Sequence, residues 1–546
     1  MDSEEDIPQY SKEVAKGSLW NLAGSVALKL SSFLYVILIA RAASQDDVGL
    51  FYLAISVVSL VSIFSDLGLA GALLRYIPYF EGRNEKGKIK DLLNLSYTVS
   101  TVVAIILMAI IWWQADAIAI AYHNPALSGA IHMLVAYLLL ANFFRIGLSA
   151  LQGFADMRSM QYAANIQNGL KLVLTALFFY LYGASVITLS AAFLLSHAPA
   201  AIIAIVNISR RTATFPSGGT SIAPRQLFGE IVPFGLMLNI VTLFWTMTAY
   251  TDRLLLGYLT APAVSTETVA VYTIAVTMAT VLIVFPASIA SIFLPVMSRL
   301  AGRNEPSHMR QILDTSQRWA MFITLPLGLV MIVFSSDMLG VFYGQAYAGG
   351  GLAMAIFTFG LLAQELSCML LYALAALRLV KLELKIAFAI TVINVVLNVL
   401  LIPAYGMEGS AIASAVGGIV ITMLLMYYGN KLFSFTLPSG AFKLILAAIA
   451  TFVIMLAMKP IASSLVPLLP VIDAFQPYAN KVIYLAYLSI LGAVTAALFF
   501  FFVFILKCLK NEDVLLMKKA MHRIKVPQPL ISVAVATASF GVGIRK

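Results

Sequence analysis

The sequence predicts an all-α polytopic membrane protein, and three observations support this fold class. Hydrophobic residues make up 61% of the 546 residues, whereas charged residues make up only 11%. Long apolar runs recur along the chain, and each is long enough to cross a hydrocarbon core, which requires about 20 helical residues. The two cysteines give neither a disulfide framework nor a metal-ligand spacing. We therefore expect a bundle of membrane-spanning helices and not a set of soluble domains.

The first two apolar runs, Leu19–Arg41 and Val48–Leu74, predict two spans joined by the turn Ala42–Asp47. Twelve further runs follow, so that the prediction is 14 transmembrane helices. The further spans are predicted at Leu92–Trp113, Ala130–Leu151, Gln161–Tyr182, Val186–Ile208, Glu230–Leu256, Glu267–Leu294, Trp319–Phe342, Leu352–Ala376, Leu384–Ile402, Glu408–Gly429, Phe442–Leu465 and Lys481–Leu506.

The distribution of positive charge predicts the orientation of these spans. The formal net charge is +10, and most of the 35 Lys and Arg residues fall in the two terminal tails and in the loops that follow even-numbered spans. Dense examples are Arg75–Lys90, Arg210–Arg225 and Arg299–Arg318. Because Lys and Arg accumulate on the cytoplasmic side of membrane proteins, both termini are expected to be cytoplasmic.

Short motifs repeat at a near-constant offset of about 220 residues, which predicts an internal duplication. Val48–Ala54 is similar to Val269–Ala275, and Gly82-Arg-Asn-Glu85 recurs as Gly302-Arg-Asn-Glu305. The offset covers six spans, so the two halves keep the same orientation about an axis along the membrane normal. We expect two pseudo-twofold-related six-helix bundles around a central cleft, followed by two extra C-terminal helices.

This duplication predicts six segments along the chain. They are a cytoplasmic N-terminal tail (1–18), an N-lobe with spans one to six (19–208), a cytoplasmic linker (209–229), a C-lobe with spans seven to twelve (230–429), spans thirteen and fourteen (430–506) and a basic cytoplasmic C-terminal tail (507–546).

Lys29 is the strongest candidate for a functional side chain. It lies about 15 Å into the first span at ~1.5 Å per residue, which is too deep to reach the interface easily. Its helical face also carries Ser18, Asn21, Ser25 and Ser32, and a similar stripe on the second span ends at Asp66. A charge at this depth must face protein or water. We expect Lys29 to line a hydrophilic cavity; the structural alternative is an ion pair with Asp66.

Further ionisable residues lie inside the predicted spans. Lys171 shares a face with Asn168, which favours a second cavity position, whereas Arg145 lies near the cytoplasmic end and is equally compatible with snorkelling. Glu365, deep in span ten, is either a proton or cation site or a buried hydrogen-bonded carboxyl group. Arg253 lies on the polar stripe of span seven, and an interfacial position is expected for its neighbour Asp252. The predicted cavity is therefore cationic on its first lobe.

Several motifs resemble one family of membrane proteins. The stretches Lys16–Leu22, Ala40–Phe51 and Asp252–Tyr258 are similar to the polysaccharide-transporter branch of the multidrug/oligosaccharidyl-lipid/polysaccharide exporter superfamily, and to its O-unit flippases. The resemblance extends from about Tyr10 to Leu506. It implies a flippase, not an enzyme, that moves polyprenyl-diphosphate-linked oligosaccharide from the cytoplasmic to the outer leaflet by alternating access. Its expected location is the plasma membrane of a prokaryote, where it would serve cell-surface polysaccharide or glycoprotein assembly.

Buried cations suit such a substrate, because its diphosphate head cannot cross hydrocarbon unaided. The expected partners are this lipid-linked oligosaccharide, membrane lipids and a glycan polymerase or transferase, with no nucleic acid. No metal or cofactor is expected, although transport is open to coupling with a proton or sodium gradient. The predicted substrate-binding residues are Lys29, Lys171, Arg145, Arg253, Asn21, Ser25 and Asn168, and the predicted coupling residues are Asp66 and Glu365.

Three alternatives compete with this hypothesis. A cation-coupled multidrug exporter would favour acidic over basic cavity residues. A lipid II flippase typically has an Arg-Asp pair in its first span, which this sequence lacks. A glycan polymerase or glycosyltransferase acting on the same lipid carrier is the enzymatic alternative. The sequence has neither an Asp-x-Asp pair for a sugar nucleotide nor a phosphate-binding Gly-x4-Gly-Lys-Ser/Thr loop, so the flippase hypothesis is preferred.

Overall fold

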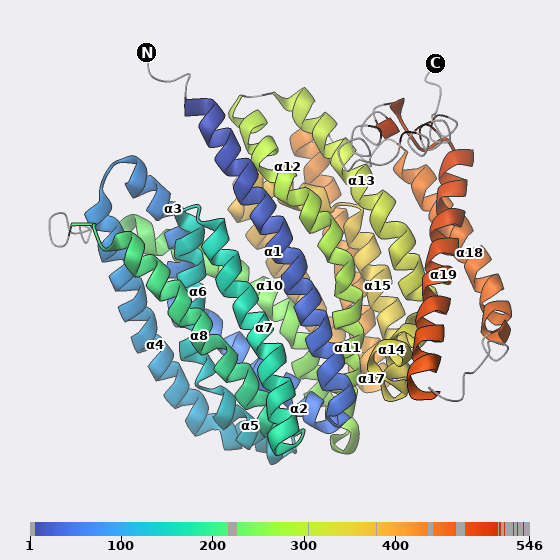
Figure 1. Cartoon of the computed structure of the whole chain (residues 1–546), viewed down its shortest axis with the longest axis horizontal. Helices are drawn as coiled ribbons and strands as arrows, with labels where there is room; N and C mark the ends of the chain where they lie inside the picture. The colour runs from blue at the N-terminus through green and yellow to red at the C-terminus, as the bar shows by residue number, and fades with distance from the viewer. Residues whose placement is uncertain are drawn as a thin grey trace. The chain divides into compact units, whose positions relative to one another are not determined.

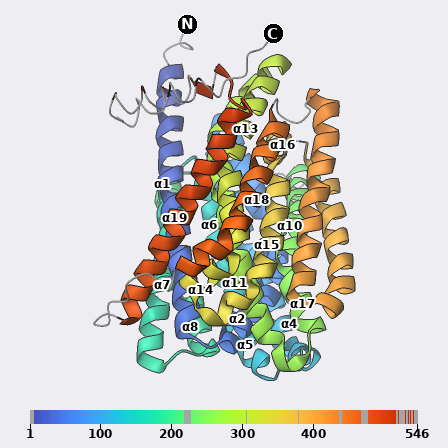
Figure 2. The same cartoon turned by 90° about the vertical axis from the view of Figure 1, so that its right-hand side faces the viewer.

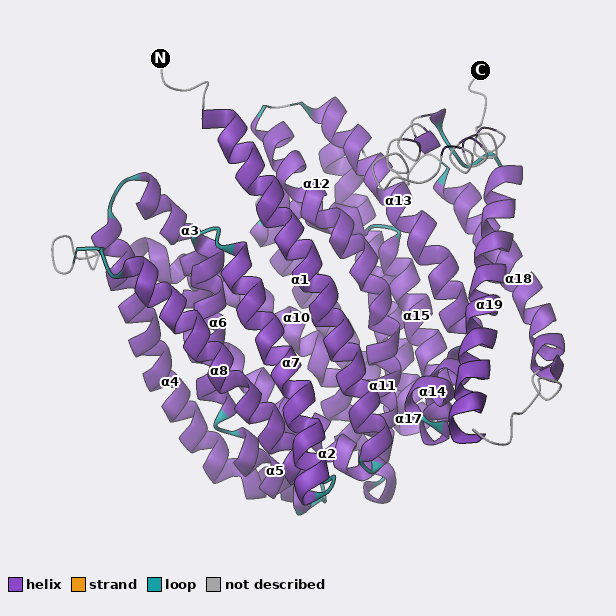
Figure 3. Ribbon diagram, viewed as in Figure 1, coloured by secondary structure: helices purple, strands orange, loops and turns teal. Residues whose placement is uncertain are grey.

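The computed structural model describes residues 6–216, 227–303, 305–377, 379–434, 440–465 and 476–511 together with a few isolated later positions. Side chains are described throughout these ranges except at 6–23, 227–228, 292, 461–465 and 476–483. Every regular element in the described residues is a helix (Figure 3). The all-α prediction is confirmed.

Twelve helical stretches of the described chain are long and apolar enough to cross a membrane. Helix α7 (Met157–Tyr182) is not among them, because Gln161, Asn165, Asn168 and Lys171 dilute its apolar character. Helix α17 (Val380–Phe433) is counted as one of the twelve stretches. A straight helix of its 54 residues would be roughly 80 Å long at ~1.5 Å per residue. Its backbone breaks at Gly406, where φ is 55° and ψ is −131°.

The chain divides into two compact units. Unit 1 comprises Met1–Ile274 with Val380–Ala413, and unit 2 comprises Ala275–Leu379 with Ser414–Lys546. These boundaries differ from those of the two predicted lobes, because α11 and α17 each run from one unit into the other.

Most of unit 1 consists of long helices, of which α4, α6, α7 and α8 lie side by side (Figure 1). Its helices are α1 (Asp6–Ala42), α2 (Gln45–Ser62), η1 (Ile63–Asp66), α3 (Leu69–Gly82), α4 (Lys86–Ala121), α5 (Ala126–Leu134), α6 (Tyr137–Gly153), α7, α8 (Val186–Thr212), η2 (Leu227–Ile231), α10 (Val232–Leu259), η3 (Pro262–Val264) and the first part of α11 (Ser265–Ala279). A core of fully buried apolar side chains, including Leu73, Ile77, Phe80 and Ile146, joins α3, α4, α6 and α8. Burial of apolar area at about 25 cal/mol per Å² stabilises this packing.

The predicted second span is interrupted in its middle. Helix α2 continues into the 3-10 turn η1, and the chain then passes through Leu67 and Gly68 with φ values of 48° and 79° before α3 begins. Asp66 stabilises the break because its carboxylate accepts the N–H groups of Gly68 and Ala70 at 3.1 and 3.3 Å. A Cβ atom on Gly68 would lie 2.1 Å from the carbonyl oxygen of Gly235. The continuous helix predicted for Val48–Leu74 is therefore wrong.

Similar interruptions occur in other predicted spans. The fourth consists of α5 and α6, which are separated at Val135 and Ala136, and the tenth consists of α15 (Gly351–Glu365) and α16 (Cys368–Ala376). In the eighth, the 3-10 turn η4 (Thr280–Ile283) separates α11 from α12 (Val284–Gly302). The hydropathy pattern does not reveal these breaks, because the residues on both sides are apolar.

Unit 2 contains the rest of α11 and α17, η4, α12, α13 (Pro306–Val333), α14 (Ser335–Tyr343), η5 (Gln345–Gly350), α15, α16, α18 (Ala441–Leu465) and α19 (Gln476–Ile505). Helices α18 and α19 lie side by side (Figure 2). They share a core in which Met455 of α18 and Leu491 of α19 pack with Val333 and Phe334 at the end of α13.

A buried charge network holds the start of the C-terminal segment against α13. Arg318 is fully buried and binds Asp314 at 2.7 Å and Asp513 at 2.9 Å. Lys510 also binds Asp314, at 2.9 Å. Removal of one partner from a buried ion pair costs about 3–5 kcal/mol, so this network fixes the chain directly after α19.

Candidate functional site

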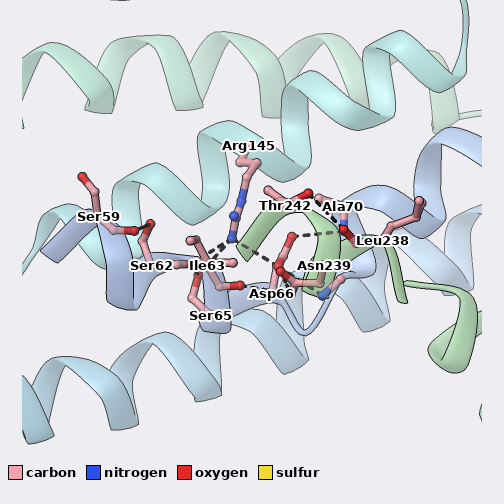
Figure 4. Close-up of polar contacts among 11 residues, drawn as sticks. Ser59, Ser62, Ile63, Ser65, Asp66, Ala70, Arg145, Leu238, Asn239 and Thr242 are labelled. Carbon is pink, nitrogen blue, oxygen red and sulfur yellow. Dashed lines mark hydrogen bonds and ion pairs between the residues drawn. The ribbon is translucent and has the colours of Figure 1, made fainter. Parts of the chain in front are cut away.

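An ion pair between Asp66 and Arg145 lies at the interrupted second span (Figure 4). Nη2 of Arg145, on α6, lies 3.2 Å from Oδ1 of Asp66 and donates to the carbonyl of Ser62 at 2.9 Å. Asn239 of α10 donates to the carbonyl of Ile63 at 3.1 Å and to Asp66 at 3.3 Å. The Asp66 side chain is 4% exposed and that of Arg145 is 33% exposed. The buried carboxylate therefore has a cation, an amide and two backbone N–H groups as donors.

Asp66 pairs with Arg145 and not with Lys29, so the structure does not contain the ion pair that was the structural alternative for Lys29. Lys29 is exposed on α1 and has neither an ion pair nor a hydrogen bond among the described side chains. Ser25 is exposed on the same helix, whereas the side chain of Asn21 lies outside the described part. An exposed ammonium group at this depth of α1 is consistent with a position that faces water, the first of the two alternatives for Lys29.

A polar cavity of about 430 Å³ adjoins Arg145 inside unit 1. Its polar lining comes from Ser62, Tyr137, Asn142, Arg145, Ser149, Gln152 and His197. Asn142 is 1% exposed, and neither its Nδ2 nor its Oδ1 has a hydrogen-bond partner in the described structure. A buried amide left unpaired costs about 1–3 kcal/mol, so a polar ligand or water in the cavity would stabilise it.

Lys171 is buried where α7 packs on α1. It is 9% exposed, and its Nζ donates to Oδ1 of Asn168 at 3.0 Å. The same ammonium group lies 4.5 Å from the ring centroid of Tyr35, in cation–π contact. The shared helical face of Lys171 and Asn168 is confirmed. No carboxylate pairs with this lysine among the described residues, which leaves its charge available to an anion.

Tyrosines link the predicted cationic positions. The guanidinium carbon of Arg253 on α10 lies 5.6 Å from the ring centroid of Tyr52 and 5.5 Å from that of Tyr250. Tyr35 is within electrostatic range of Tyr52. Tyr137 interacts electrostatically with Tyr250 and Arg145, and it lines the same cavity as Arg145. Lys171, Arg253 and Arg145 therefore lie along one series of tyrosine side chains in unit 1 (Tyr35, Tyr52, Tyr250 and Tyr137), and we call this series the tyrosine row.

Asp252 was not predicted as a site residue; an interfacial position was expected for it, and the structure buries it among polar partners inside unit 1. It is 5% exposed, and its carboxylate accepts the hydroxyl of Tyr272 at 2.7 Å. Asn394 and Asn398 of α17 donate to it at 3.1 and 2.8 Å, and Asn398 in turn accepts from Ser410 at 2.8 Å. The two asparagines one turn apart were the sequence signal for this site, because they place two amides on one helical face.

Glu365 ends α15 in unit 2 and is 4% exposed. Its Oε2 is buried and has no hydrogen-bond partner in the described structure, and the nearby Cys368 thiol donates to Oε1 of Gln317 at 3.8 Å. Gln317 of α13 donates to the backbone carbonyl of Glu365 and accepts the Met369 N–H at 3.0 Å. Both alternatives for Glu365 remain compatible with this environment, since the carboxyl group is buried but only partly satisfied.

The side chains in the described ranges include no group of three or more His, Cys, Asp or Glu residues that could hold a metal ion. The two cysteines, Cys368 and Cys508, are free and buried.

The fold is similar to that of solved transporters. The lipid II flippase MurJ, in an inward closed conformation, has a TM-score of 0.65 at 14% identity, covering 87% of this chain and 97% of that one. An inward-facing multidrug resistance MATE family transporter of the MOP superfamily has a TM-score of 0.63 at 16% identity, covering 76% and 98%. These likenesses establish the polytopic transporter fold.

Two archaeal proteins are similar in sequence. An uncharacterized membrane protein of Methanocaldococcus jannaschii is 22% identical over 440 residues, which cover 78% of this chain and 85% of that protein. The probable low-salt glycan biosynthesis flippase Agl15 of Haloferax volcanii is 22% identical over 410 residues, which cover 72% and 79%. The second relative is named as a probable flippase and the structural neighbours are transporters, which agrees with the predicted transporter and not with an enzyme.

The model of the family described as "Polysaccharide biosynthesis protein" matches residues 38–350. The matched segment contains Arg145, Lys171, Asp252 and Arg253 and covers more than half of the 546 residues. The chain is therefore a membrane protein that belongs to the polysaccharide biosynthesis protein family.

Proposed function

We propose that this protein is a flippase for polyprenyl-diphosphate-linked oligosaccharide, moving the glycan from the cytoplasmic to the outer leaflet of a prokaryotic plasma membrane. The observation that carries the proposal is Lys171, a buried ammonium group with an amide and an aromatic ring as its described partners. A charge in this environment is costly unless a counterion arrives, since a cation at a helix centre costs ~2.5–3.5 kcal/mol on insertion scales. A diphosphate supplies that counterion. The glycan-flippase relative Agl15 supports the same substrate class.

The cavity beside Arg145 supports recognition of a polar head group. Arg145 offers donors for phosphate, and the amide of Asn142 offers a donor and an acceptor to sugar hydroxyl groups. Along the tyrosine row, cations alternate with aromatic rings that carry a hydroxyl group. This composition suits a ligand with both anionic and sugar parts.

The membrane topology belongs to this proposal. We infer 14 spans, with α7 as one span and α17 divided at Gly406 into two, and with both termini cytoplasmic. The proposed lobes are 19–208 and 230–429, which would move by alternating access, followed by two extra helices. The uneven distribution of Lys and Arg supports this orientation.

Coupling to an ion gradient is a further part of the proposal. The predicted candidates Asp66 and Glu365 are joined by Asp252, a buried carboxylate that accepts from a phenol and two amides. A proton or a sodium ion at Asp252 would neutralise a negative charge in the protein interior. Asp66 is a weaker candidate, because Arg145 already compensates its charge. A glycan polymerase or transferase that consumes the flipped product is the proposed partner.

Substitutions at the two lysines, read by glycan export in cells, test the proposed function. Lys171→Ala should reduce export severely because it removes the positive charge offered to the diphosphate, and Lys29→Glu should abolish export because it reverses that charge. Lys171→Arg should retain part of the export because it keeps the charge and changes only the geometry of the donors. Arg303→Gln, at an exposed position on the same chain, is the matched control for loss of one positive charge and should export normally. The protein level in the membrane is measured for each variant. Normal export by both Lys29→Ala and Lys171→Ala would exclude the cationic pocket.

A further inference from the structure

A second polar cavity lies on an exposed surface of unit 1, where the first turns of α7 meet the last turns of α8, two helices that pack against each other (Figure 1). Its volume is about 470 Å³. Arg158 and Tyr162 contribute from α7, and Ile202, Asn207 and Arg210 contribute from α8. None of these residues belongs to the proposed transport site, and we call this cavity the α7–α8 groove.

One end of the α7–α8 groove is built for an anion. Two guanidinium groups, Arg158 and Arg210, come from neighbouring helices, and the amide of Asn207 lies one turn before Arg210. The lining contains no carboxylate. The nearby Asp156 caps α7 by accepting the N–H of Ser159 at 3.0 Å. The wall of the groove therefore carries a net positive charge.

The remainder of the groove is apolar and exposed. Tyr162 is 62% exposed and Ile202 is 59% exposed. Further along the same face of α7, a Cβ atom on Gly169 would meet nothing within 4 Å, and Val173 is 59% exposed. Gly169 lies about 16 Å along the helix from Arg158 at ~1.5 Å per residue, which is close to half of a ~30 Å hydrocarbon core. The groove and the exposed surface that continues it to Gly169 together have about the length of one leaflet, with the arginines at the charged end.

The groove is separate from the predicted diphosphate positions. Met160 and Lys171 lie three turns apart on a face of α7 that points into unit 1, where Met160 lines the cavity beside Arg145. Arg158 and Tyr162 are exposed on a different face of α7, and Gly169, which is partly buried, continues that face. A ligand in the α7–α8 groove would therefore contact the membrane side of the helix pair.

We propose that the α7–α8 groove binds an anionic phospholipid. The lipid phosphate pairs with Arg158 and Arg210, and one acyl chain lies over Tyr162 and the open surface at Gly169. Charge complementarity favours this occupant, since basic pockets between transmembrane helices bind anionic head groups. The exposed apolar half of the groove distinguishes a lipid from a free phosphate ion.

Native mass spectrometry of the full-length protein, titrated with phosphatidylglycerol or phosphatidylcholine, tests this site. The wild type should retain phosphatidylglycerol preferentially. Arg158→Gln combined with Arg210→Gln should weaken its binding about 30-fold, which corresponds to about 1 kcal/mol for each arginine. Arg211→Gln is the matched control, because Arg211 is next in sequence but pairs with Glu81 at 3.9 Å and stacks on Phe154; it should change binding less than about threefold.

A second variant tests the acyl-chain half without a change of charge. Gly169→Leu places a side chain in the open surface and should weaken phosphatidylglycerol binding severalfold while the thermal midpoint stays within a few degrees of wild type. Equal losses in Arg211→Gln and in the double variant would overturn the proposal, because nonspecific surface charge would then explain the binding. Displacement of the lipid by millimolar inorganic phosphate, or stronger competition by a polyprenyl diphosphate, would also overturn it.

Discussion

Asp66 combines two roles in a single side chain. Its carboxylate pairs with Arg145 and at the same time caps the helix that starts after the interrupted second span. Asn239 adds a third contact from α10. A change at this residue therefore alters both the charge balance beside the cavity and the geometry of the helix break.

The ion pair at Asp66 gives a stability prediction. Arg145→Gln should cost about 3–5 kcal/mol, because it leaves a buried carboxylate without its cation. Asp66→Asn should cost about 1.5–3 kcal/mol, since an amide oxygen still accepts one backbone N–H. Thermal unfolding of the detergent-purified variants measures both. Arg211→Gln is the control, because Arg211 is half-exposed and its pair with Glu81 is 3.9 Å long. This variant should lower the free energy of unfolding by less than about 1 kcal/mol. A cost for Arg145→Gln as small as this control would contradict the role assigned to the pair.

Asp252 gives a functional prediction at the same scale. Asp252→Asn should abolish the dependence of transport on a sodium or proton gradient, because an amide neither binds a proton in this range nor attracts a cation. Tyr272→Phe removes one hydrogen bond and keeps the carboxylate, so gradient dependence should persist. Transport into inverted vesicles with and without each gradient is the measurement. A gradient dependence that survives in Asp252→Asn but disappears in Glu365→Gln would assign coupling to Glu365.

Sequence reasoning placed Lys171 beside Asn168 correctly, because both lie within one turn of the same helix. It did not find the partner of Asp66, because Arg145 follows 79 positions later and reaches it only through the packing of α6 on η1. Asp252 was misjudged for the same reason. Its partners Asn394 and Asn398 lie on a helix that is distant in the sequence. The position of Asp252 near the end of its own predicted span gave no information about these two partners.

At the scale of whole helices, hydropathy predicted where the chain is helical but not where the helices break. The break after Asp66 depends on two local features, a left-handed Gly68 and a carboxylate that caps the next helix. The close approach of Gly68 to Gly235 fixes the break against α10. An apolar run has the same composition on both sides of such a break, so periodicity alone cannot detect it.

Gly68 can be tested against a matched glycine. Gly68→Ala should destabilise the protein by about 2–5 kcal/mol, because it combines a left-handed conformation, which costs roughly 1–2 kcal/mol, with a steric conflict worth ~1–3 kcal/mol. Gly235, on the other side of the same contact, is helical in α10, and a Cβ atom added there would lie 2.6 Å from the carbonyl oxygen of Gly68, so Gly235→Ala should cost only the steric part, offset by up to about 1 kcal/mol because alanine favours a helix over glycine. Chemical unfolding in detergent compares the two. A negligible cost for Gly235→Ala would show that the contact does not matter, and equal costs for the two variants would show that the left-handed conformation of Gly68 does not matter.

At the scale of the molecule, the number and direction of the spans can be tested by labelling. Gly82 and Gly349 are suitable positions, since a Cβ atom at either would meet nothing within 4 Å. In a chain with Cys368 and Cys508 replaced by serine, Gly82→Cys should react with an impermeant thiol reagent only from the cytoplasmic side, and Gly349→Cys only from the outer side. Labelling of both from one side would contradict the 14-span topology.

The buried Arg318 has a consequence for how the chain is completed. Asp314 is synthesised one turn before it, but Asp513 lies 195 residues later in the sequence. Until the ribosome has added that last partner, the guanidinium group in the middle of α13 lacks one of the carboxylate counterions that it contacts in the folded protein. A nascent chain that stops after α19 would carry this defect permanently, and quality-control proteases could distinguish it from finished protein. An affinity tag for purification should accordingly follow residue 513 and never replace it.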